Sequence, residues 1–292
     1  MIYGIVVVTY NRLNMLKICI DHIKKQSIKY DKIIVINNCS TDGTEKYLSE
    51  VHDIQVENLS QNMGGAGGFS LGIKMAEKLG CNWITVIDDD AILDENFLLN
   101  LRLWHNEHSD IKAMCGAVYN KNRISLAYAR RFKIDNKNHK VHVWNVPKSE
   151  YMKDFFYCDF ATFCGVTFNA DLIKKIGYPN ERYFISFDDT EYTFRMSNIT
   201  PIALVTAAII DHRANSGGGA AWKLYYNVRN ELYTIKKHFG YKCAWEITKE
   251  RVAQINQFIR ENSIIKKRKA MIWAGIIDAW LGRLGTHKQF RP

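Results

Sequence analysis

The sequence predicts an α/β fold with an open, largely parallel sheet. Short runs of β-branched residues at 2–8 and 32–37 flank a segment, 13–26, whose apolar residues recur at helical spacing. Such runs are typical of strands buried on both faces of a parallel sheet. Apolar residues form 47% of the 292-residue chain and charged residues 24%, which excludes a disordered or fibrous protein.

The remaining elements continue this alternation. We expect a short helix ending near residue 50, a weak strand at 54–57, a glycine-rich loop at 61–68, a helix at 69–79 and a strand at 83–87. A polar segment at 130–153 predicts a hairpin or an excursion over a site. A core strand at 202–210, a glycine-rich stretch at 216–220 and helices from 222 to about 284 follow. We therefore expect an α/β domain over residues 1–220 and a helical extension over residues 221–292.

Cysteine content and charge narrow the class of protein. The seven cysteines are odd in number and form no CxxC pair, which predicts buried free thiols rather than a disulfide framework. No apolar run approaches the ~20 residues of a membrane span. No charged leader precedes the first strand, so we expect a cytoplasmic protein. The net charge is +10, and residues 264–292 hold seven basic residues against one acidic residue, which predicts an acidic partner.

Three consecutive aspartates, Asp88, Asp89 and Asp90, follow the strand at 83–87. Adjacent carboxylates repel one another, so the cluster destabilises the fold unless a cation neutralises it. Side chains alternate along a strand, which places Asp88 and Asp90 on one side. Their oxygens suit Mg²⁺ or Mn²⁺, ions that bridge phosphate oxygens. The pattern predicts metal and diphosphate binding; the alternative is a solvated acidic turn that caps the next helix.

Other polar segments also lie where a parallel sheet binds a nucleotide. Residues 9–12 follow the first strand and residues 37–44 follow the second. Helix capping and turn formation explain their polar residues almost as well. The sequence NMGGAGGF at 62–69 precedes a predicted helix. Glycines let a ligand approach the backbone, and a helix N-terminus favours anions, but similar loops occur in dinucleotide and methyl-donor sites or as plain turns.

The sequence FDDTEY at 187–192 predicts a loop that enters a helix. Asp188 and Glu191 have the spacing of a capping box. Asp189 then stands in the first turn, where the helix dipole favours an ionised carboxylate that can act as a general base. His212 follows the strand at 202–210. A histidine there is usually structural, but a neutral imidazole could also complete the metal shell begun by Asp88 and Asp90.

Together these segments resemble the family 2 glycosyltransferases of the GT-A fold. The resemblance runs from the first strand to His212 and rests on the order of VVVTYNR (6–12), INNCSTDGT (36–44), NMGGAGGF (62–69), WITVIDDD (83–90) and FDDTEY (187–192). The glycine-rich form, the DDD triplet, FDDTE and YYNVRNELY (225–233) look like the branch of galactofuranosyl- and rhamnosyltransferases.

The resemblance implies a Rossmann-like GT-A sheet and inverting transfer of a sugar from a nucleoside diphosphate to an acceptor hydroxyl. It implies that Asp88, Asp90 and His212 hold Mn²⁺ or Mg²⁺, that Asp189 deprotonates the acceptor, and that Asp188 binds acceptor hydroxyls or caps the helix. The residues implied for nucleotide-sugar binding are Thr9, Tyr10, Asn11, Arg12, Asn37, Asn62, Gly65, Gly68, Asp88 and Asp89.

One position departs from the family pattern. Asn37 stands where the family usually has an aspartate that accepts a hydrogen bond from the pyrimidine imide N–H. An asparagine carbonyl can accept the same bond without the charge. UDP- and dTDP-sugars therefore both remain open as donors, with UDP-galactofuranose as the first expectation.

The helical extension adds two predictions. Trp222, Tyr226 and Arg229 are candidates for acceptor binding, with ordinary helix packing as the alternative. The basic residues at 266–269 precede an apolar stripe (Trp273, Ile276, Ile277, Trp280 and Leu284) that is typical of an amphipathic helix on an anionic bilayer, or of one that packs on the protein or a second subunit. We expect a glycan or polyprenyl-linked acceptor at the inner face of the cell membrane; a homo-oligomer is left open.

Two other classes explain less of the sequence. A sugar nucleotidyltransferase also combines an α/β sheet with clustered aspartates, but it would have a basic, glycine-rich first turn, which residues 9–13 lack. A non-catalytic basic module explains the C-terminal charge but not the three aspartates. We therefore expect an enzyme of bacterial surface-polysaccharide synthesis, with no nucleic acid partner.

Overall fold

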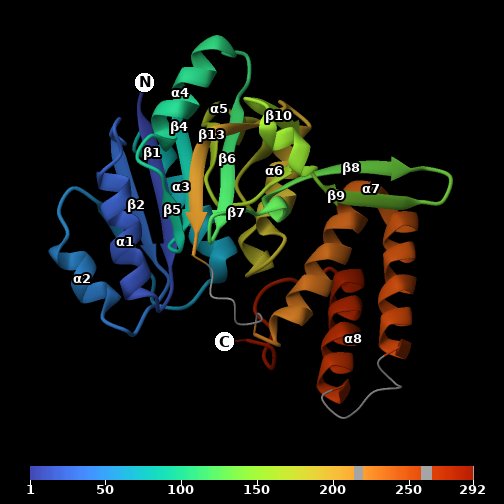
Figure 1. Cartoon of the computed structure of the whole chain (residues 1–292). Helices are drawn as coiled ribbons and strands as arrows, with labels where there is room; N and C mark the ends of the chain where they lie inside the picture. The colour runs from blue at the N-terminus through green and yellow to red at the C-terminus, as the bar shows by residue number, and fades with distance from the viewer. Residues whose placement is uncertain (214–219, 258–264, 292) are drawn as a thin grey trace.

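A mixed sheet forms the centre of the computed structural model, which describes residues 1–213, 220–257 and 265–291 (Figure 1). The strands lie in the order β10-β13-β6-β12-β4-β1-β2-β3, and β5 and β7 pair with β13 and β6. Their bounds are β1 (Tyr3–Thr9), β2 (Lys32–Asn37), β3 (Gln55–Asn58), β4 (Trp83–Asp88), β5 (Ala91–Leu93), β6 (Ala113–Asn120), β7 (Arg123–Ile124), β10 (Phe155–Cys158), β12 (Val166–Asn169) and β13 (Ile202–His212). The strands β1, β2, β3 and β4 are parallel to one another, as predicted. The strand β12 runs antiparallel between β4 and β6.

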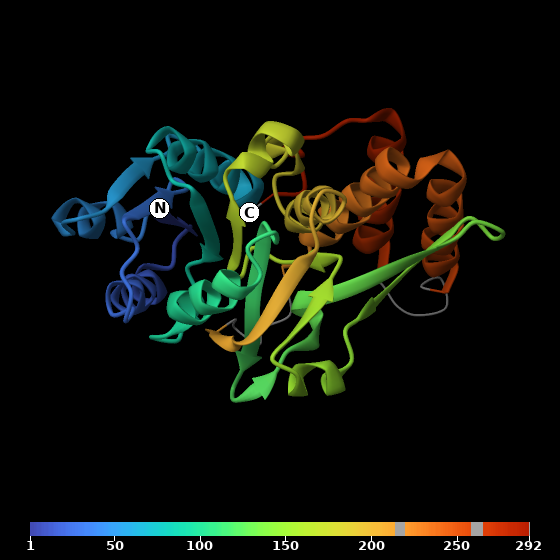
Figure 2. The same ribbon diagram turned by 90° about the horizontal axis from the view of Figure 1, so that it is seen from above.

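Alternation along β1 divides the core between the two faces of the sheet. Ile5 and Val7 pack with α1 (Leu13–Lys24), α2 (Thr44–Glu50) and α4 (Phe97–Glu107). Val6 and Val8 face the opposite layer, which holds α3 (Gly64–Lys78), α5 (Asp171–Ile176) and α6 (Asp188–Ser197). Figure 2, seen from above, shows helices on both sides of the strands. The predicted α/β fold with flanking helices is confirmed.

The glycine-rich segment differs from the prediction of a loop, because α3 already begins at Gly64. Close packing explains these glycines better than flexibility does. A Cβ atom on Gly68 would lie 2.6 Å from Val8 Cγ1, and one on Gly72 would lie 2.2 Å from Val6 Cγ1. The helix can approach β1 this closely only because both positions lack a side chain. The other glycine-rich stretch, at 216–220, lies outside the described residues except for Ala220.

The polar segment at 130–153 forms a hairpin, one of the two predicted alternatives. Its strands, β8 (Ala129–Asp135) and β9 (Lys140–Asn145), join β11 (Phe160–Ala161) in a second, three-stranded sheet. Val141 packs into the core of the helical extension, and Lys140 Nζ lies 3.3 Å from Glu250 Oε1. The hairpin therefore links the α/β part of the chain to α7 (Figure 1).

The helical extension consists of α7 (Lys223–Gln257) and α8 (Ile265–Leu281). The dihedral angles of Gly240 (φ 87°, ψ 172°) interrupt α7, so it comprises two helical segments. The pair buries its own apolar cluster, which includes Val228, Leu232, Ile272 and Ile276. A domain boundary at residue 220 stays a prediction. No helix within the described ranges is long and apolar enough to cross a bilayer. All seven cysteines are free, and every one except Cys39 is buried.

Candidate active site

Polar side chains from three strand ends meet at one edge of the sheet. The strand register pairs Thr9 with Asn37 and Val8 with Asp88, so the carboxyl ends of β1, β2 and β4 lie side by side. A cavity of about 690 Å³ opens at this edge. Its lining includes the seven predicted site residues with acidic or basic side chains: Arg12, Asp88, Asp89, Asp90, Asp188, Asp189 and His212. This is the edge where a doubly wound sheet binds its ligands.

His212 reaches the acidic triplet through a short strand that the sequence did not reveal. β5 follows Asp90 directly and pairs antiparallel with β13, which places Ala91 opposite His212. The Arg213 amide donates to the Asp90 carbonyl at 2.8 Å, and His212 Nε2 lies 3.2 Å from Asp90 Oδ1. One ligand atom from each of Asp88, Asp90 and His212 lies within 4.8 Å of the others. These three donors, two oxygens and one nitrogen, fit a divalent cation.

Arg12 and Thr9 hold the triplet in place. Arg12 Nη1 lies 2.5 Å from Asp90 Oδ2 and 3.0 Å from Asp89 Oδ1. Thr9 Oγ1 donates to Asp89 Oδ2 at 2.7 Å. Two residues that we predicted to contact the nucleotide, Thr9 and Arg12, therefore line the cavity and also bond to the acidic triplet.

The acidic triplet is electrostatically unfavourable as it stands. Burial, together with the charges of Asp90 and Asp89, raises the pKa of Asp88 to about 8. Burial also raises the pKa of Asp89 to about 6 against the opposing charge of Arg12. At Asp90 burial disfavours the charge, but the hydrogen bond with His212 and the charge of Arg12 outweigh it and lower the pKa. A bound cation would relieve this penalty.

Tyr128 orients His212, although it was not among the predicted site residues. The Tyr128 hydroxyl lies 2.9 Å from His212 Nδ1 and leaves Nε2 facing Asp90. A partner on the second ring nitrogen is the usual way in which a ligating histidine is oriented. Tyr128 ends a short 3₁₀ helix, Leu126–Tyr128, 84 residues before His212, and no local pattern marks it.

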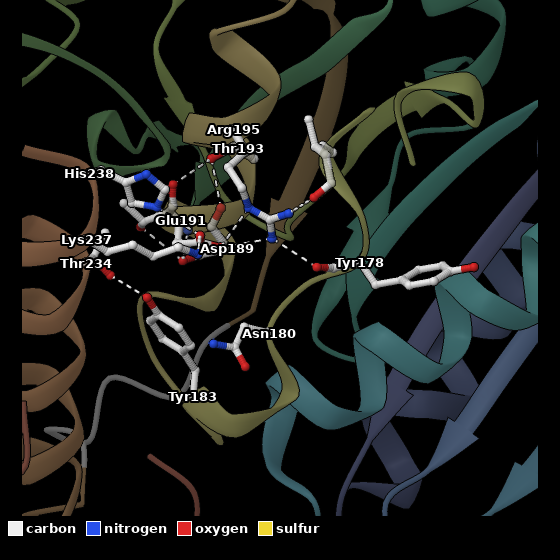
Figure 3. Close-up of polar contacts among 12 residues, drawn as sticks. Tyr178, Asn180, Tyr183, Asp189, Glu191, Thr193, Arg195, Thr234, Lys237 and His238 are labelled. Atoms are coloured by element: carbon white, nitrogen blue, oxygen red, sulfur yellow. Dashed lines mark hydrogen bonds and ion pairs between the residues drawn. The ribbon is translucent and has the colours of Figure 1, made fainter. Parts of the chain in front are cut away.

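The predicted capping box is wrong. Phe187, with φ 65°, is the N-cap of α6, and no side chain caps that helix. Glu191 is fully buried and bonds to side chains instead: Arg195 Nη2 lies 3.0 Å, Lys237 Nζ 2.8 Å and His238 Nε2 2.9 Å from its carboxylate (Figure 3). Lys237 and His238 belong to α7, so Glu191 ties α6 to the helical extension rather than capping its own helix.

Asp188 and Asp189 face different surroundings in the first turn of α6. Asp188 is buried near Gly65, and burial together with the charge of Asp189 raises its pKa to about 8. Asp189 Oδ1 accepts hydrogen bonds from the Thr190 amide at 2.5 Å and from Thr190 Oγ1 at 3.0 Å. Both aspartates line the cavity. Asp189 is partly exposed whereas Asp188 is buried, and the role of Asp189 as a base stays a prediction.

Two of the four predicted acceptor residues, Tyr226 and Arg229, lie away from the cavity at the sheet edge. Both side chains are buried. Arg229 donates to the carbonyls of Tyr183 at 2.9 Å and Gly285 at 2.6 Å, so its guanidinium holds the backbone. The alternative of helix packing applies to both residues. Trp222 does line the cavity and remains a candidate.

The remaining nucleotide candidates divide in the same way. Tyr10, Asn62 and Gly65 line the cavity, whereas Asn11, Asn37 and Gly68 do not. Asn37 Oδ1, the atom expected to accept from a pyrimidine, accepts from the Ser40 amide at 3.1 Å. Gly68 faces Val8 in the core, so its predicted contact with the nucleotide is replaced by a packing role. Asn38, which was not singled out, lines the cavity.

The sheet, the acidic triplet at its edge and the flanking helices are features of the glycosyltransferases with a GT-A fold. Comparison with known sequences agrees: the profile of glycosyl transferase family 2 matches residues 4–174, more than half of the chain. The chain belongs to glycosyl transferase family 2. The matched part includes the acidic triplet and ends before Asp188.

Two curated relatives fall in the branch that the motifs indicated. The galactofuranosyltransferase GlfT1 of Mycolicibacterium smegmatis is 29% identical over 203 residues, which cover 65% of this chain. The dTDP-rhamnosyl transferase RfbF of Shigella flexneri is 24% identical over 247 residues, covering 80% of this chain and 79% of its own. The chain spans 64% of the length of GlfT1, a little under two thirds.

Solved structures confirm the fold. Residues 1–349 of TarS from S. aureus, in complex with UDP-GlcNAc, superpose with a TM-score of 0.64 at 15% identity. That similarity covers 96% of this chain and 81% of the TarS chain. It extends beyond the segment matched by the family profile and includes the helical extension.

Proposed function

We propose that this chain is an inverting, metal-dependent glycosyltransferase that moves a sugar from a nucleoside diphosphate to a glycan or polyprenyl-linked glycan. One observation carries the proposal: Asp88, Asp90 and His212 line the same cavity as the carboxylate of Asp189. The proposed donor is UDP-galactofuranose, from which galactofuranose is transferred, and the similarity to GlfT1 supports it. The similarity to RfbF supports the alternative of a dTDP-rhamnose donor.

The proposed reaction is a single displacement. The acceptor oxygen bonds to the anomeric carbon while the bond from that carbon to the diphosphate oxygen breaks. The proton of the acceptor hydroxyl passes to Asp189, and the electron pair leaves with the nucleoside diphosphate. Mn²⁺ or Mg²⁺, held by Asp88, Asp90 and His212, would neutralise charge on the leaving diphosphate. One displacement at one carbon inverts its configuration.

The other residues of the cavity have supporting roles in this proposal. Arg12 and Thr9 fix the acidic triplet, while Tyr10 and Gly65 contribute surface to the donor site. Trp222 lies where it can contact the acceptor. We also propose that the enzyme acts in the cytoplasm at the inner face of the membrane in surface-polysaccharide synthesis. In that setting, residues 1–220 perform the catalysis and residues 221–292 contact the acceptor and the membrane.

The proposal is tested by a donor assay with paired variants. Wild-type protein is incubated with UDP-galactofuranose or dTDP-rhamnose, an octyl glycoside acceptor and Mn²⁺. We expect transfer from one donor and its loss on chelation. Asp189→Asn is expected to keep nucleotide affinity and to lower transfer about 10²- to 10⁴-fold.

Asp171→Asn, at an exposed carboxylate, serves as the matched control and should transfer as the wild type does. Nucleotide binding that does not depend on metal, or full activity of Asp189→Asn, contradicts the proposal. Pyrophosphate release from a nucleoside triphosphate and a sugar 1-phosphate would instead indicate a sugar nucleotidyltransferase.

A further inference from the structure

A second cavity lies between the 186–190 segment and α7. It has a volume of about 500 Å³, within the range of small-ligand sites. Ser186 and Asp189 line this cavity and also the cavity at the sheet edge that holds the acidic triplet, which we call the metal-site cavity. Asp189 therefore lies at the boundary between two cavities, one with the acidic triplet and one without it.

A connected set of polar side chains from α7 lines the second cavity. Arg251 Nε donates to Glu231 Oε2 at 2.9 Å, and a second nitrogen of Arg251 contacts the same oxygen. Arg251 Nη1 donates to Gln254 Oε1 at 3.3 Å, and Asn227 adds a further amide to the lining. These contacts fix the orientation of Glu231 and Arg251 before any ligand arrives, which lowers the entropic cost of binding.

The charge of this lining favours a neutral ligand over a phosphate. Asp189 and Glu231 contribute two carboxylates, and the guanidinium of Arg251 is already paired with Glu231. Among the described residues that line the cavity there is no unpaired cation to attract a phosphate. The carboxylates and amides can accept and donate hydrogen bonds to hydroxyl groups. Leu224 and Val228 supply an apolar wall, which suits the C–H face of a sugar ring.

We propose that the second cavity binds a neutral sugar unit of the acceptor, with its reactive hydroxyl directed at Asp189. The donor would occupy the metal-site cavity, so the carboxylate that takes the proton lies between the two substrates. Phosphate groups of a polyprenyl-linked acceptor would lie outside the second cavity. The inference rests on the proposed function, since it assigns the acceptor site of that same reaction.

The test compares acceptor kinetics with donor binding in the full chain. The variants are Asn227→Ala and Glu231→Gln, and the acceptor probes are octyl galactofuranoside and octyl rhamnoside. We expect each variant to raise the KM for the octyl glycoside about tenfold, the effect of losing about one hydrogen bond. The Kd for UDP in the presence of Mn²⁺ should match that of the wild type, which also shows that each variant is folded.

Glu250→Gln is the matched control, because Glu250 lies on the same helix and forms an exposed pair with Lys140. It should leave the acceptor KM unchanged. Unchanged acceptor KM in both Asn227→Ala and Glu231→Gln overturns the inference, as does competition of inorganic phosphate with the octyl glycoside. A wild-type protein that binds no nucleotide with Mn²⁺ overturns the proposed function itself, which separates the two failures.

Discussion

Asn230 Nδ2 lies 2.8 Å from the carbonyl oxygen of Ser186, two residues before the first aspartate of α6. The same buried amide also contacts the carbonyls of Tyr183 at 3.0 Å and Ile185 at 2.9 Å. Within this segment Phe184, Ser186 and Phe187 have φ values of 66°, 67° and 65°. Left-handed conformations of such residues cost of order 1–3 kcal/mol each and persist only where neighbouring groups enforce them. A side chain from α7 therefore helps to fix the position of Asp188 and Asp189.

Asn230→Ala is expected to lower transfer more than it lowers nucleotide affinity. The substitution removes the donor to three carbonyls and should also destabilise the fold by about 1–3 kcal/mol. Because the metal-site residues lie on other elements, the Kd for UDP with Mn²⁺ should stay near the wild-type value while kcat falls. Asn106→Ala, on the exposed side of α4, is the control for a lost amide. Equal loss of kcat and nucleotide affinity would mean that Asn230 supports the fold as a whole.

Gly65 and Gly68 lie on the first turns of α3, and their substitution should have opposite effects. A Cβ on Gly68 would lie 2.6 Å from Val8 Cγ1, so Gly68→Ala should destabilise the core by about 1–3 kcal/mol. The atom nearest a Cβ on Gly65 is Asp188 Oδ2 at 4.0 Å, in the cavity. Gly65→Ala should therefore keep or slightly raise the melting temperature, since alanine favours the helix, and should weaken donor binding. Thermal unfolding and nucleotide titration of the two variants distinguish these outcomes.

The sequence was a good guide wherever the chemistry is local. The strands β1, β2 and β4 and the polar groups at their ends follow from periodicity. The shared position of Asp88, Asp90 and His212 was expected from the resemblance to the family, because His212 lies far from the triplet in the sequence and reaches it through the pairing of β5 with β13. The sheet edge that gathers them is a property of any parallel α/β arrangement.

Contacts made across long sequence distances were not predictable in this way. Glu191 has capping-box spacing, yet Lys237 and His238 on α7 decide its partners. Arg229 resembles a ligand-binding arginine until the carbonyls of Tyr183 and Gly285 are seen around it. No sequence pattern around Tyr128 indicates its contact with His212. In each case the deciding partner is brought in by tertiary packing, which local propensity does not encode.

Glu191 should make the stability of the protein depend on acid pH. Burial opposes its charge, but the hydrogen bond with His238 and the charges of Arg195 and Lys237 outweigh it and lower its pKa from 4.5 to about 2. Because the folded-state pKa lies below the unfolded value, this carboxylate stabilises the fold above about pH 5. That contribution, about 3 kcal/mol, is lost as the pH falls toward 2.

Glu191→Gln should accordingly lower the free energy of unfolding at pH 7, and its difference from wild type should shrink between pH 5 and pH 3. Urea unfolding at several pH values measures both quantities. Glu250→Gln, at an exposed ion pair with Lys140, should change the free energy of unfolding by no more than about 1 kcal/mol. A difference between Glu191→Gln and wild type that does not vary with pH would contradict the assignment.

The two faces of α8 predict a membrane-binding surface. Ile272 and Ile276 are buried against α7, and Trp280 Nε1 donates to Thr248 Oγ1 at 3.0 Å, so part of the predicted apolar stripe serves internal packing. Trp273, Ile277 and Leu281 follow one another at four-residue spacing and are 45%, 50% and 59% exposed. The exposed lysines and arginine at 266–268 precede them on the same helix.

This arrangement suits a helix lying on an anionic bilayer, because basic residues near the surface contribute about 1 kcal/mol each and an inserted tryptophan or isoleucine about 1.5–3 kcal/mol. The double variant Trp273→Ser, Ile277→Ser should therefore bind phosphatidylglycerol vesicles more weakly, by about two orders of magnitude. Wild-type binding should fall with added salt and on phosphatidylcholine vesicles. Leu103→Ser removes a side chain that is 55% exposed on α4 and should bind as the wild type does. If the double variant sediments with anionic vesicles as the wild type does, the exposed stripe has another partner, and a change in oligomeric state on the same substitutions would identify a second copy of the chain.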